Sequence, residues 1–309
     1  MHKFQILFYL IIISFCPGTA LADPNVIIIS VDALRPDYMA AYGYVRVTTP
    51  NLDRLAEQGT IFLDASTSIP LTNPALASLF TSQSLKATGV NRNGIRLLTG
   101  NRTLAEMLRE QGYSTAAVVS CWALYHSRSG LDRGFDHYQD RGTSFKLDLN
   151  ASLVTSRALA LLESVIEEPF LLWIHYSDAH QPHSDKPSPG FSRKPEAKDS
   201  SSRLRENYES ELAYIDYWIG QLLKELKARN LFGRSLFIIL SDHGEALAEK
   251  KYTGHGRRLY QTILRIPLIF YGPSLPAGKR ISAPVQILDV MPTLLAYLGM
   301  EPEGEREGR

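Results

Sequence analysis

The sequence predicts an α/β fold, in which a doubly wound, mostly parallel sheet carries helices on both faces. Two observations support this prediction. Short apolar runs recur along the 309-residue chain, and segments with helical periodicity lie between them. Near-continuous apolar strands indicate a sheet covered on both faces, and strands that alternate with helices are typical of doubly wound α/β proteins. The length fits one large domain or two small ones.

The expected strands are short and rich in Ile, Val, Leu and Phe. Each is bounded by polar residues, glycine or proline, which separates a buried strand from a longer buried helix. In chain order they are residues 25–31, 114–121, 170–177, 235–241 and 266–271.

The expected helices have apolar residues at positions i, i+3 and i+4. The first is residues 103–112, where Thr103 and Glu106 have the spacing of a capping box and Gly112 marks the end. The others are residues 151–168 and 203–230. Residues 183–203 have no such periodicity and are rich in proline, serine and charge, so we expect a long surface loop near the active edge.

The first 22 residues predict a signal peptide. Lys3 precedes an apolar stretch at residues 4–15, and an A-x-A sequence ends at Ala22. The stretch is too short to span a bilayer, so we expect cleavage before Asp23, secreted or periplasmic localisation and no stable membrane span afterwards. An uncleaved anchor is the alternative. Residues 23–309 would then form the catalytic domain.

Composition limits the classes of partner. The 33 Lys and Arg residues nearly balance the 32 Asp and Glu residues, and like charges form no long run. Nothing in this charge pattern indicates a basic nucleic-acid footprint, so we expect a small-molecule partner and no nucleic acid, whereas the oligomeric state is not predicted. Cleavage would leave Cys121 as the single cysteine, so no intramolecular disulfide is expected, and Cys121 fits a buried strand thiol.

Acidic residues and histidines follow three of the expected strands. The carboxyl ends of the parallel strands lie at one edge of a doubly wound sheet, and ligands bind at that edge. We therefore expect these residues to lie close together there. A single Asp after a strand is often only the N-cap of the next helix, but three such strand ends favour a site. The residues are Asp32, Asp178, His180, Asp242, His243 and Glu245. Of these, Asp32, Asp242 and His243 offer oxygen and nitrogen ligands for a divalent cation.

Thr72 is the candidate nucleophile. Pro74 fits the first turn of a helix, which places Thr72 near the helix N-terminus, where backbone N–H groups favour an anion. A cation touching the same oxygen would favour its ionised form. The residues themselves leave a second interpretation open, that Thr72 merely caps this helix.

Several segments together resemble the sulfatase family within the alkaline phosphatase superfamily. The resemblance rests on residues 25–44, 48–65, 170–183, 208–226, 239–273 and 287–300, and on the T-x-P element at Thr72. It implies a metal-dependent hydrolase or transferase of sulfate or phosphate esters. It also implies that Asp32, Asp242 and His243 bind metal, that His180 assists the leaving group and that His255 is a second active-site histidine.

The chain departs from the typical sulfatase at the nucleophile. Sulfatases carry Cys or Ser followed by x-P-S-R, and that residue is oxidised to formylglycine. Thr72 cannot give an aldehyde because its β-carbon bears a methyl group, and Leu76 replaces the arginine. Ala33 replaces the second Asp of the usual pair, and residues 116–126 lack the lysine and histidine of the K-W-H element. The remaining pattern resembles the threonine-nucleophile branches, the phosphodiesterases and phosphoethanolamine transferases, in which Thr72 would also be a metal ligand.

The expected function is therefore that of an exported, metal-dependent enzyme in which Thr72 attacks a phosphoester. Zinc is the favoured metal, with calcium or manganese possible. A sulfuric ester hydrolase without formylglycine and a catalytically degenerate binding protein are the alternatives. A second metal would have to use Asp178, His180, His183 or His255.

The remaining candidates have simpler interpretations. We expect His183, in the predicted loop, to be solvent-exposed, His175 to be a satisfied core histidine and Asp289 to cap or pack its helix. Residues 300–309 resemble the family's approach to a smaller C-terminal subdomain. That resemblance predicts that the subdomain is missing and that the sequence is truncated.

Overall fold

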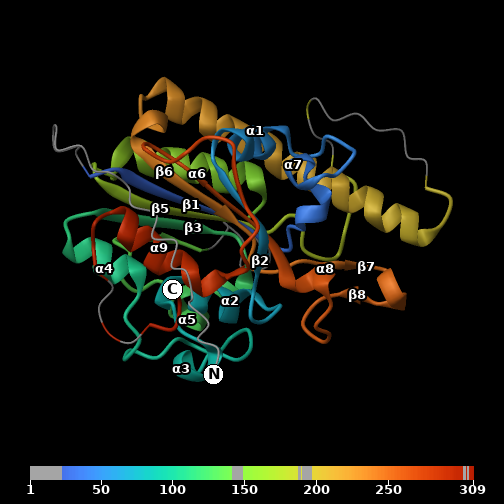
Figure 1. Ribbon diagram of the computed structural model, residues 1–309, viewed down its shortest axis with the longest axis horizontal. Coiled ribbons are helices and arrows are strands. Elements are labelled where there is room, and N and C mark those ends of the chain that lie inside the picture. Colours follow the sequence, from blue (N-terminus) through green and yellow to red (C-terminus); the bar gives the residue numbers. More distant parts are fainter. Residues whose placement is uncertain (1–22, 141–148, 187–188, 190–196, 302–303, 305) are drawn as a thin grey trace, which may run out of the picture.

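The computed structural model describes residues 23–140, 149–186, 189, 197–301, 304 and 306–309. The predicted signal peptide and part of the predicted loop lie outside these ranges. Within them, nine strands form one sheet in the order β10-β2-β9-β6-β1-β5-β3-β4, with β11 also paired to β2 (Figure 1). The strands are β1 (Asn25–Val31), β2 (Thr60–Ser66), β3 (Ser114–Val119), β4 (His137–Gln139), β5 (Phe170–Tyr176), β6 (Ser235–Leu240), β9 (Arg265–Tyr271), β10 (Lys279–Ile281) and β11 (Val285–Gln286). A separate hairpin pairs β7 (Ala246–Leu247) with β8 (Thr253–Gly254).

The sheet is mostly parallel, as predicted. Only β9 runs antiparallel to its neighbours in the described sheet, β2 and β6. The central strand β1 lies between β5 and β6, and every residue of β1 is buried. All five expected strands are present, and β2, which the apolar pattern did not predict, lies between β9 and the short strands β10 and β11.

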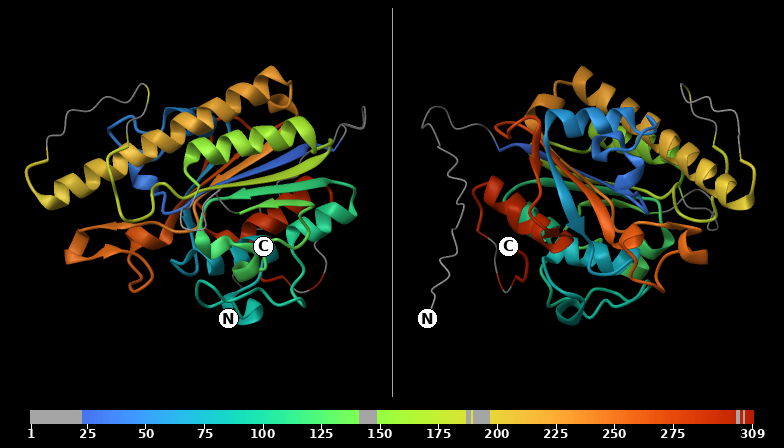
Figure 2. Two further views of the ribbon diagram at one scale, coloured as in Figure 1. Left: turned by 180° about the vertical axis from the view of Figure 1, so that it is seen from behind. Right: turned by 45° about the vertical axis from the view of Figure 1, so that its right-hand side comes forward.

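Helices cover both faces of the sheet (Figure 2). One hydrophobic core lies under α1 (Pro50–Gln58), α6 (Ala151–Ser164) and α7 (Ser200–Ala228). The other lies under α2 (Thr72–Thr81), α4 (Leu104–Glu110) and α9 (Val290–Tyr297). Successive strand residues alternate between the two cores, as Trp173 and Ile174 do, because side chains alternate across a strand. Short helices are α3 (Leu85–Thr88), α5 (His126–Ser129) and α8 (Gln261–Leu264), with 3₁₀ turns at Pro36–Tyr38, Ala40–Tyr42, Trp122–Leu124, Phe232–Arg234, Glu249–Lys251 and Ile287–Asp289.

Local sequence signals explain the helix starts. The Thr103 side chain accepts a hydrogen bond from the backbone of Glu106, and the Glu106 side chain accepts one from Thr103, so the predicted capping box of α4 is confirmed. Asp199 caps α7, which begins at Ser200 and therefore inside the segment expected to be loop. Asp289 lies at the start of α9, and its side chain accepts from the Gln286 backbone.

The carboxyl ends of β1, β2, β5 and β6 lie at one edge of the sheet. β2 points the same way as β6 because both are antiparallel to β9. The segments that follow these strands therefore meet at this edge. None of the helices in the described ranges is both long and apolar enough to cross a bilayer.

Candidate active site

Three predicted metal ligands form a buried cluster at this edge. One ligand atom from each of Asp32, Asp242 and His243 lies within 4.8 Å of the others. His243 Nε2 is 3.5 Å from Asp32 Oδ1 and 3.4 Å from Asp242 Oδ2, and all three side chains are fully buried. Asp32 and Asp242, which are 210 positions apart in sequence, therefore lie close together, as their positions at strand ends predicted.

Backbone donors fix the orientation of Asp242. Its Oδ1 accepts hydrogen bonds from the N–H groups of His243, at 2.9 Å, and of Ala33, at 3.3 Å. Ala33 has a φ of 63°, in the left-handed region that alanine seldom adopts. With Oδ1 engaged, Oδ2 of Asp242 is left facing the cluster.

The tautomer of His243 follows from its other ring nitrogen. His243 Nδ1 lies 2.9 Å from the carbonyl oxygen of Gly244. A carbonyl only accepts, so Nδ1 carries the proton and Nε2 presents its lone pair to the two carboxylates. This is the arrangement by which proteins orient a metal-binding histidine.

The inward-facing atoms of the cluster have no hydrogen-bond partner within the described part of the chain. These buried atoms are both carboxylate oxygens of Asp32, Oδ2 of Asp242 and Nε2 of His243, and Oγ1 of Thr72, at the start of α2, is likewise buried without a partner in this part of the chain. Buried polar atoms are normally paired, since leaving them unpaired costs about 1–3 kcal/mol each. The two carboxylates and the imidazole of the cluster are a donor set that suits a divalent cation, so the residues present fit the implied metal.

Asp32 is stabilised as a carboxylate. Burial alone would raise its pKa, but His180, His175 and His243 outweigh burial and hold the pKa below its ordinary value. His175 is buried and its Nδ1 lies 2.8 Å from Ser30 Oγ, as expected for a core histidine. Its Nε2, however, faces Asp32 Oδ2 at 3.9 Å, so His175 also supports the cluster.

Thr72 is the first residue of α2 and not its cap. Leu71 occupies the N-cap position, and Thr72 Oγ1 has no hydrogen-bond partner among the described residues, so the interpretation of Thr72 as a cap is wrong. A Cβ placed on Gly256 would lie 3.1 Å from Leu71 Cδ2, so the start of α2 packs against the loop that follows β8. Thr72 is 1% exposed, and its unpartnered Oγ1 is therefore buried at the edge that carries the cluster.

The other two predicted catalytic residues, His180 and His255, lie beside the cluster. Their ring centroids are 4.9 Å apart, and the rings of His255 and His243 are 4.1 Å apart. His180 Nδ1 donates to the Gln181 carbonyl at 2.7 Å, which leaves Nε2 free. The charge of Asp32 raises the pKa of His180.

Glu245 is a residue for which the sequence predicted no role. Its side chain is fully buried, and Oε1 lies 3.2 Å from His255 Nδ1. Burial lowers the pKa of His255, but Glu245 outweighs burial and the net pKa is raised. The sequence feature that could have indicated a role for Glu245 is its position two residues after the predicted ligand His243. Arg35, buried between Asp37 and Glu249, donates to the Glu245 carbonyl and so holds this turn.

Two further candidates are engaged with other partners. The prediction that His183 is solvent-exposed is wrong, because its side chain is buried and Nδ1 lies 2.6 Å from Glu211 Oε2 on α7. Asp178 forms an ion pair with Lys186 at 2.5 Å. In the part of the chain that the structure describes, Asp32, Asp242 and His243, here called the metal-type cluster, are the one group of three side chains placed to hold a metal ion. Asp178, His180, His183 and His255 form no second group of this kind.

A cavity of about 360 Å³ opens beside the cluster. Asp32 and His180 form part of its wall, so a molecule inside it would touch the candidate catalytic groups. The rest of the wall consists of Cys121, Trp122, Leu149, Asn150, Ser177, Asp178, Gln181, Pro182, Ser184, Lys186 and Glu211. Cys121 is buried, as predicted, but it follows β3, which ends at Val119, and so is not a strand residue.

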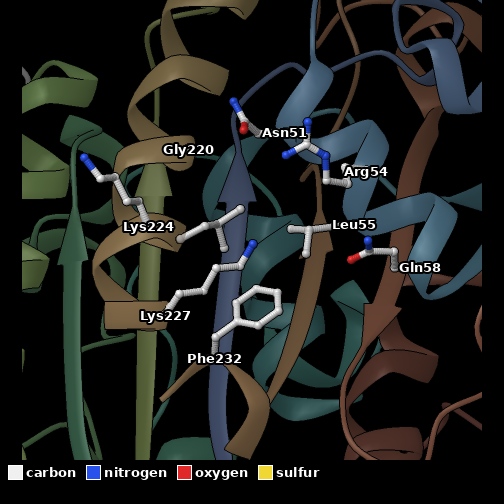
Figure 3. A pocket seen from close by; sticks show the side chains of 9 residues that line it. Asn51, Arg54, Leu55, Gln58, Gly220, Lys224, Lys227 and Phe232 are labelled. Carbon is white, nitrogen blue, oxygen red and sulfur yellow. The ribbon is translucent and has the colours of Figure 1, made fainter. Parts of the chain in front are cut away.

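A second pocket, of about 280 Å³, lies between α1 and α7 (Figure 3). Its charged residues are Arg54, Lys224 and Lys227, and the Lys227 ammonium lies over the Phe232 ring. No residue of the metal-type cluster lines it, so it is separate from the candidate active site.

The comparison with known families agrees with this geometry, because the sequence model of the Sulfatase family matches residues 24–300. The chain belongs to the sulfatase family. A protein named "Sulfatase" from Formosa agariphila is 24% identical over 93% of this chain and 71% of its own length. A delta 4,5-hexuronate-2-O-sulfatase from Bacteroides thetaiotaomicron is 24% identical over 96% of this chain and 73% of its own length. An ulvan-active sulfatase from Formosa agariphila is 25% identical, and the match spans 63% of its length.

Solved structures confirm the alkaline-phosphatase-like α/β fold. The phosphonate monoester hydrolase of Agrobacterium radiobacter superimposes with a TM-score of 0.77 at 21% identity, covering 92% of this chain and 75% of that one. A 2-O GAG sulfatase gives 0.75 at 22% identity, covering 93% and 73%. Family membership confirms the expected class of ester hydrolase.

Proposed function

We propose that this sulfatase-family protein is an exported, metal-dependent phosphoester hydrolase in which Thr72 is the nucleophile. One observation carries the proposal. The Thr72 hydroxyl is buried and unpartnered at the start of α2, at the sheet edge where Asp32, Asp242 and His243 present unpartnered ligand atoms. A structural threonine would satisfy its hydroxyl locally, whereas a nucleophile must keep its oxygen available.

Asp32, Asp242, His243 and Thr72 would hold the metal. A bound divalent cation would stabilise the ionised threonine oxygen and offset the negative charge of the ester. The imidazole ligand favours zinc, and the oxygen ligands also accommodate calcium or manganese.

The protein groups would carry out the reaction in two displacements. Thr72 Oγ1 forms a bond to phosphorus, with its backbone neighbours at the start of α2 favouring negative charge. The bond from phosphorus to the leaving oxygen breaks, and that oxygen takes a proton from His180, whose pKa is raised by Asp32. Water or another hydroxyl compound then attacks phosphorus, gives its proton to His180 and releases Thr72.

The identity of residue 72 favours phosphate esters over sulfate esters. Threonine cannot be oxidised to the formylglycine of the typical sulfatase, and Leu76, in place of the arginine of that signature, is buried in the core. The names of the relatives favour a second candidate, the hydrolysis of a sulfuric ester without formylglycine.

Metal analysis and a paired ester assay test the proposal. The purified protein should contain a divalent metal and hydrolyse 4-nitrophenyl phosphate or bis(4-nitrophenyl) phosphate faster than 4-nitrophenyl sulfate. Thr72→Ala should keep the metal on the three remaining ligands, Asp32, Asp242 and His243, and lose about 10³-fold or more in kcat. Thr81→Ala, which removes a buried hydroxyl from the last residue of the same helix, is the matched control and should keep its activity.

Each other outcome selects a different function. An active Thr72→Ala protein would rule out the threonine mechanism. Faster turnover of the sulfate would select the sulfuric ester hydrolase, and a protein with neither metal nor turnover would be a binding protein. Export is checked separately by N-terminal sequencing of the protein from its native host, which should begin at Asp23.

A further inference from the structure

The segment at residues 183–186 is fixed to α7 by buried side chains. Glu211 Oε2 lies 2.6 Å from His183 Nδ1, and Glu211 Oε1 accepts from the Ser184 backbone at 2.7 Å. The Lys186 backbone donates to Ser210 Oγ at 2.9 Å. A segment that the sequence assigned to a surface loop is therefore held in one position beside the active site.

This anchoring makes Lys186 part of the wall of the cavity that Asp32 and His180 also line. The Lys186 side chain is 28% exposed, whereas its partner Asp178 is 1% exposed. An ammonium has three protons to donate, and Asp178 Oδ1 is the acceptor that the described residues supply. Lys186 can thus donate to a bound molecule without leaving Asp178.

Lys186 lies on the side of the site where a leaving group would be. It contacts α7, in the layer that covers one face of the sheet, and its ammonium lies over the Tyr214 ring at 5.5 Å. Thr72 begins α2, which covers the opposite face (Figure 1). Attacking and leaving oxygens lie roughly in line through phosphorus, so a nucleophile from the α2 side directs the leaving group toward the α7 side.

The cavity wall favours a neutral, oxygen-rich group. Asn150, Gln181 and Ser184 add hydrogen-bonding groups to Lys186, and Trp122, 43% exposed and with the Arg128 guanidinium over its ring at 5.4 Å, adds a flat surface. The charge of Lys186 is balanced by Asp178 at 2.5 Å, so the pair suits a hydroxyl better than a second carboxylate. Sugars combine hydroxyls with a ring face of this kind.

Resting on the proposed function, we propose that Lys186 is a specificity-determining residue that donates a hydrogen bond to a hydroxyl of a sugar-like leaving group. Asp178 is the positioning residue that holds its ammonium. The proposal concerns the leaving group and is independent of the fate of the phosphoryl group.

Two phosphate esters that share the phosphoryl group but differ in the leaving group show which of the two parts Lys186 recognises. Kinetics with glucose 6-phosphate and phenyl phosphate are compared in wild type, Lys186→Met and Lys186→Arg. A hydrogen bond to a charged donor contributes about 1.5–3 kcal/mol, so Lys186→Met should lower kcat/KM by about 10-fold or more further for glucose 6-phosphate than for phenyl phosphate. Lys186→Arg should restore part of the difference. Lys224→Met, on the exposed face of α7, is the matched lysine control.

A binding measurement separates this proposal from the proposed function. Calorimetry on the metal-loaded Thr72→Ala protein compares the Kd values of the same two esters without turnover. The Lys186→Met change should weaken glucose 6-phosphate selectively even if phosphate esters prove not to be hydrolysed. Equal weakening of both esters, or of neither, overturns the proposal. A larger loss for 4-carboxyphenyl phosphate than for glucose 6-phosphate would also overturn it, because Lys186 would then bind an anion.

Discussion

Glu245 Oε1 lies 3.2 Å from Nδ1 of His255, and the Glu245 carboxylate has no exposed surface. The contact joins the turn after β6 to the loop after β8, and the His255 ring lies against that of the metal-type ligand His243. Glu245 therefore fixes the orientation of a histidine at the candidate site without belonging to the set of predicted ligands.

A double-mutant cycle should show that this pair acts as a unit. We expect Glu245→Gln and His255→Ala each to lower kcat/KM by at least about 10-fold. His255→Ala removes the imidazole, and Glu245→Gln removes the carboxylate charge that orients it. The double variant should lose little more than either single variant, with a coupling of about 1–2 kcal/mol. Glu57→Gln, at an exposed position of α1, is the control. Additive losses in the double variant would show that the two residues act independently.

Removal of one carboxylate charge should impair metal binding. Asp242→Asn keeps an oxygen that can accept from His243 and Ala33, but its second group is an amide that cannot bind a cation in place of Oδ2. We expect the zinc Kd, measured by competition with a chromophoric chelator, to rise by at least about 100-fold.

The increase in Tm that zinc gives the wild type should disappear in the same variant, because a ligand stabilises only the state that binds it. Asp64→Asn, on the exposed part of β2, should leave both measurements unchanged. An Asp242→Asn protein with the zinc affinity of the wild type would place the metal elsewhere.

The sequence predicted most of the fold because burial leaves a strong pattern. Strands covered on both faces, such as β1 and β5, are nearly all apolar, and the ligands follow directly where these strands end. β2 was not predicted because only part of it is buried and Asp64 interrupts it. The antiparallel direction of β9 was not predicted either, since an apolar run does not show whether a strand is parallel or antiparallel to its neighbours.

The predictions that failed depend on partners distant in sequence. His183 follows a polar pattern typical of a loop and is buried because Glu211, 28 positions later on α7, meets its ring. The cavity wall likewise combines Trp122 with Lys186, from segments that follow different strands. The metal-type ligands could be predicted because they directly follow expected strands. The contact of His183 with Glu211 could not, because it depends on how α7 packs against a distant segment.

Asp216 should make stability depend on pH. Its carboxylate is 1% exposed, accepts from the backbone N–H groups of Asn51 and Leu52, and has a pKa that burial raises to about 7. The folded protein therefore holds a proton that the unfolded chain releases near pH 4. For this group, stability falls as the pH rises from about 4 to 7, and the full penalty remains above pH 7.

Asp216→Asn should remove this contribution to the slope. Urea unfolding at intervals from pH 4.5 to 8 should show that the wild type loses stability relative to the variant by up to about 1.4 kcal/mol per pH unit. The difference should level off above pH 7. A constant difference over the whole range would show that Asp216 is ionised in the folded protein throughout.

Gly134 should be far less tolerant of alanine than Gly43, although both have positive φ angles, of 87° and 102°. Alanine in the left-handed region costs about 1–2 kcal/mol, and we expect roughly that for Gly43→Ala, where the new Cβ would meet nothing within 4 Å. At Gly134 the Cβ would overlap the backbone nitrogen of Glu106, which donates to Thr103 in the capping box of α4. The clash must displace the start of the helix, so the free energy of unfolding should fall by more than about 3 kcal/mol. Urea unfolding measures both costs, and if Gly134→Ala is too unstable to purify, a lower soluble yield than that of Gly43→Ala gives the same ranking. Equal costs would show that the α4 start moves without penalty.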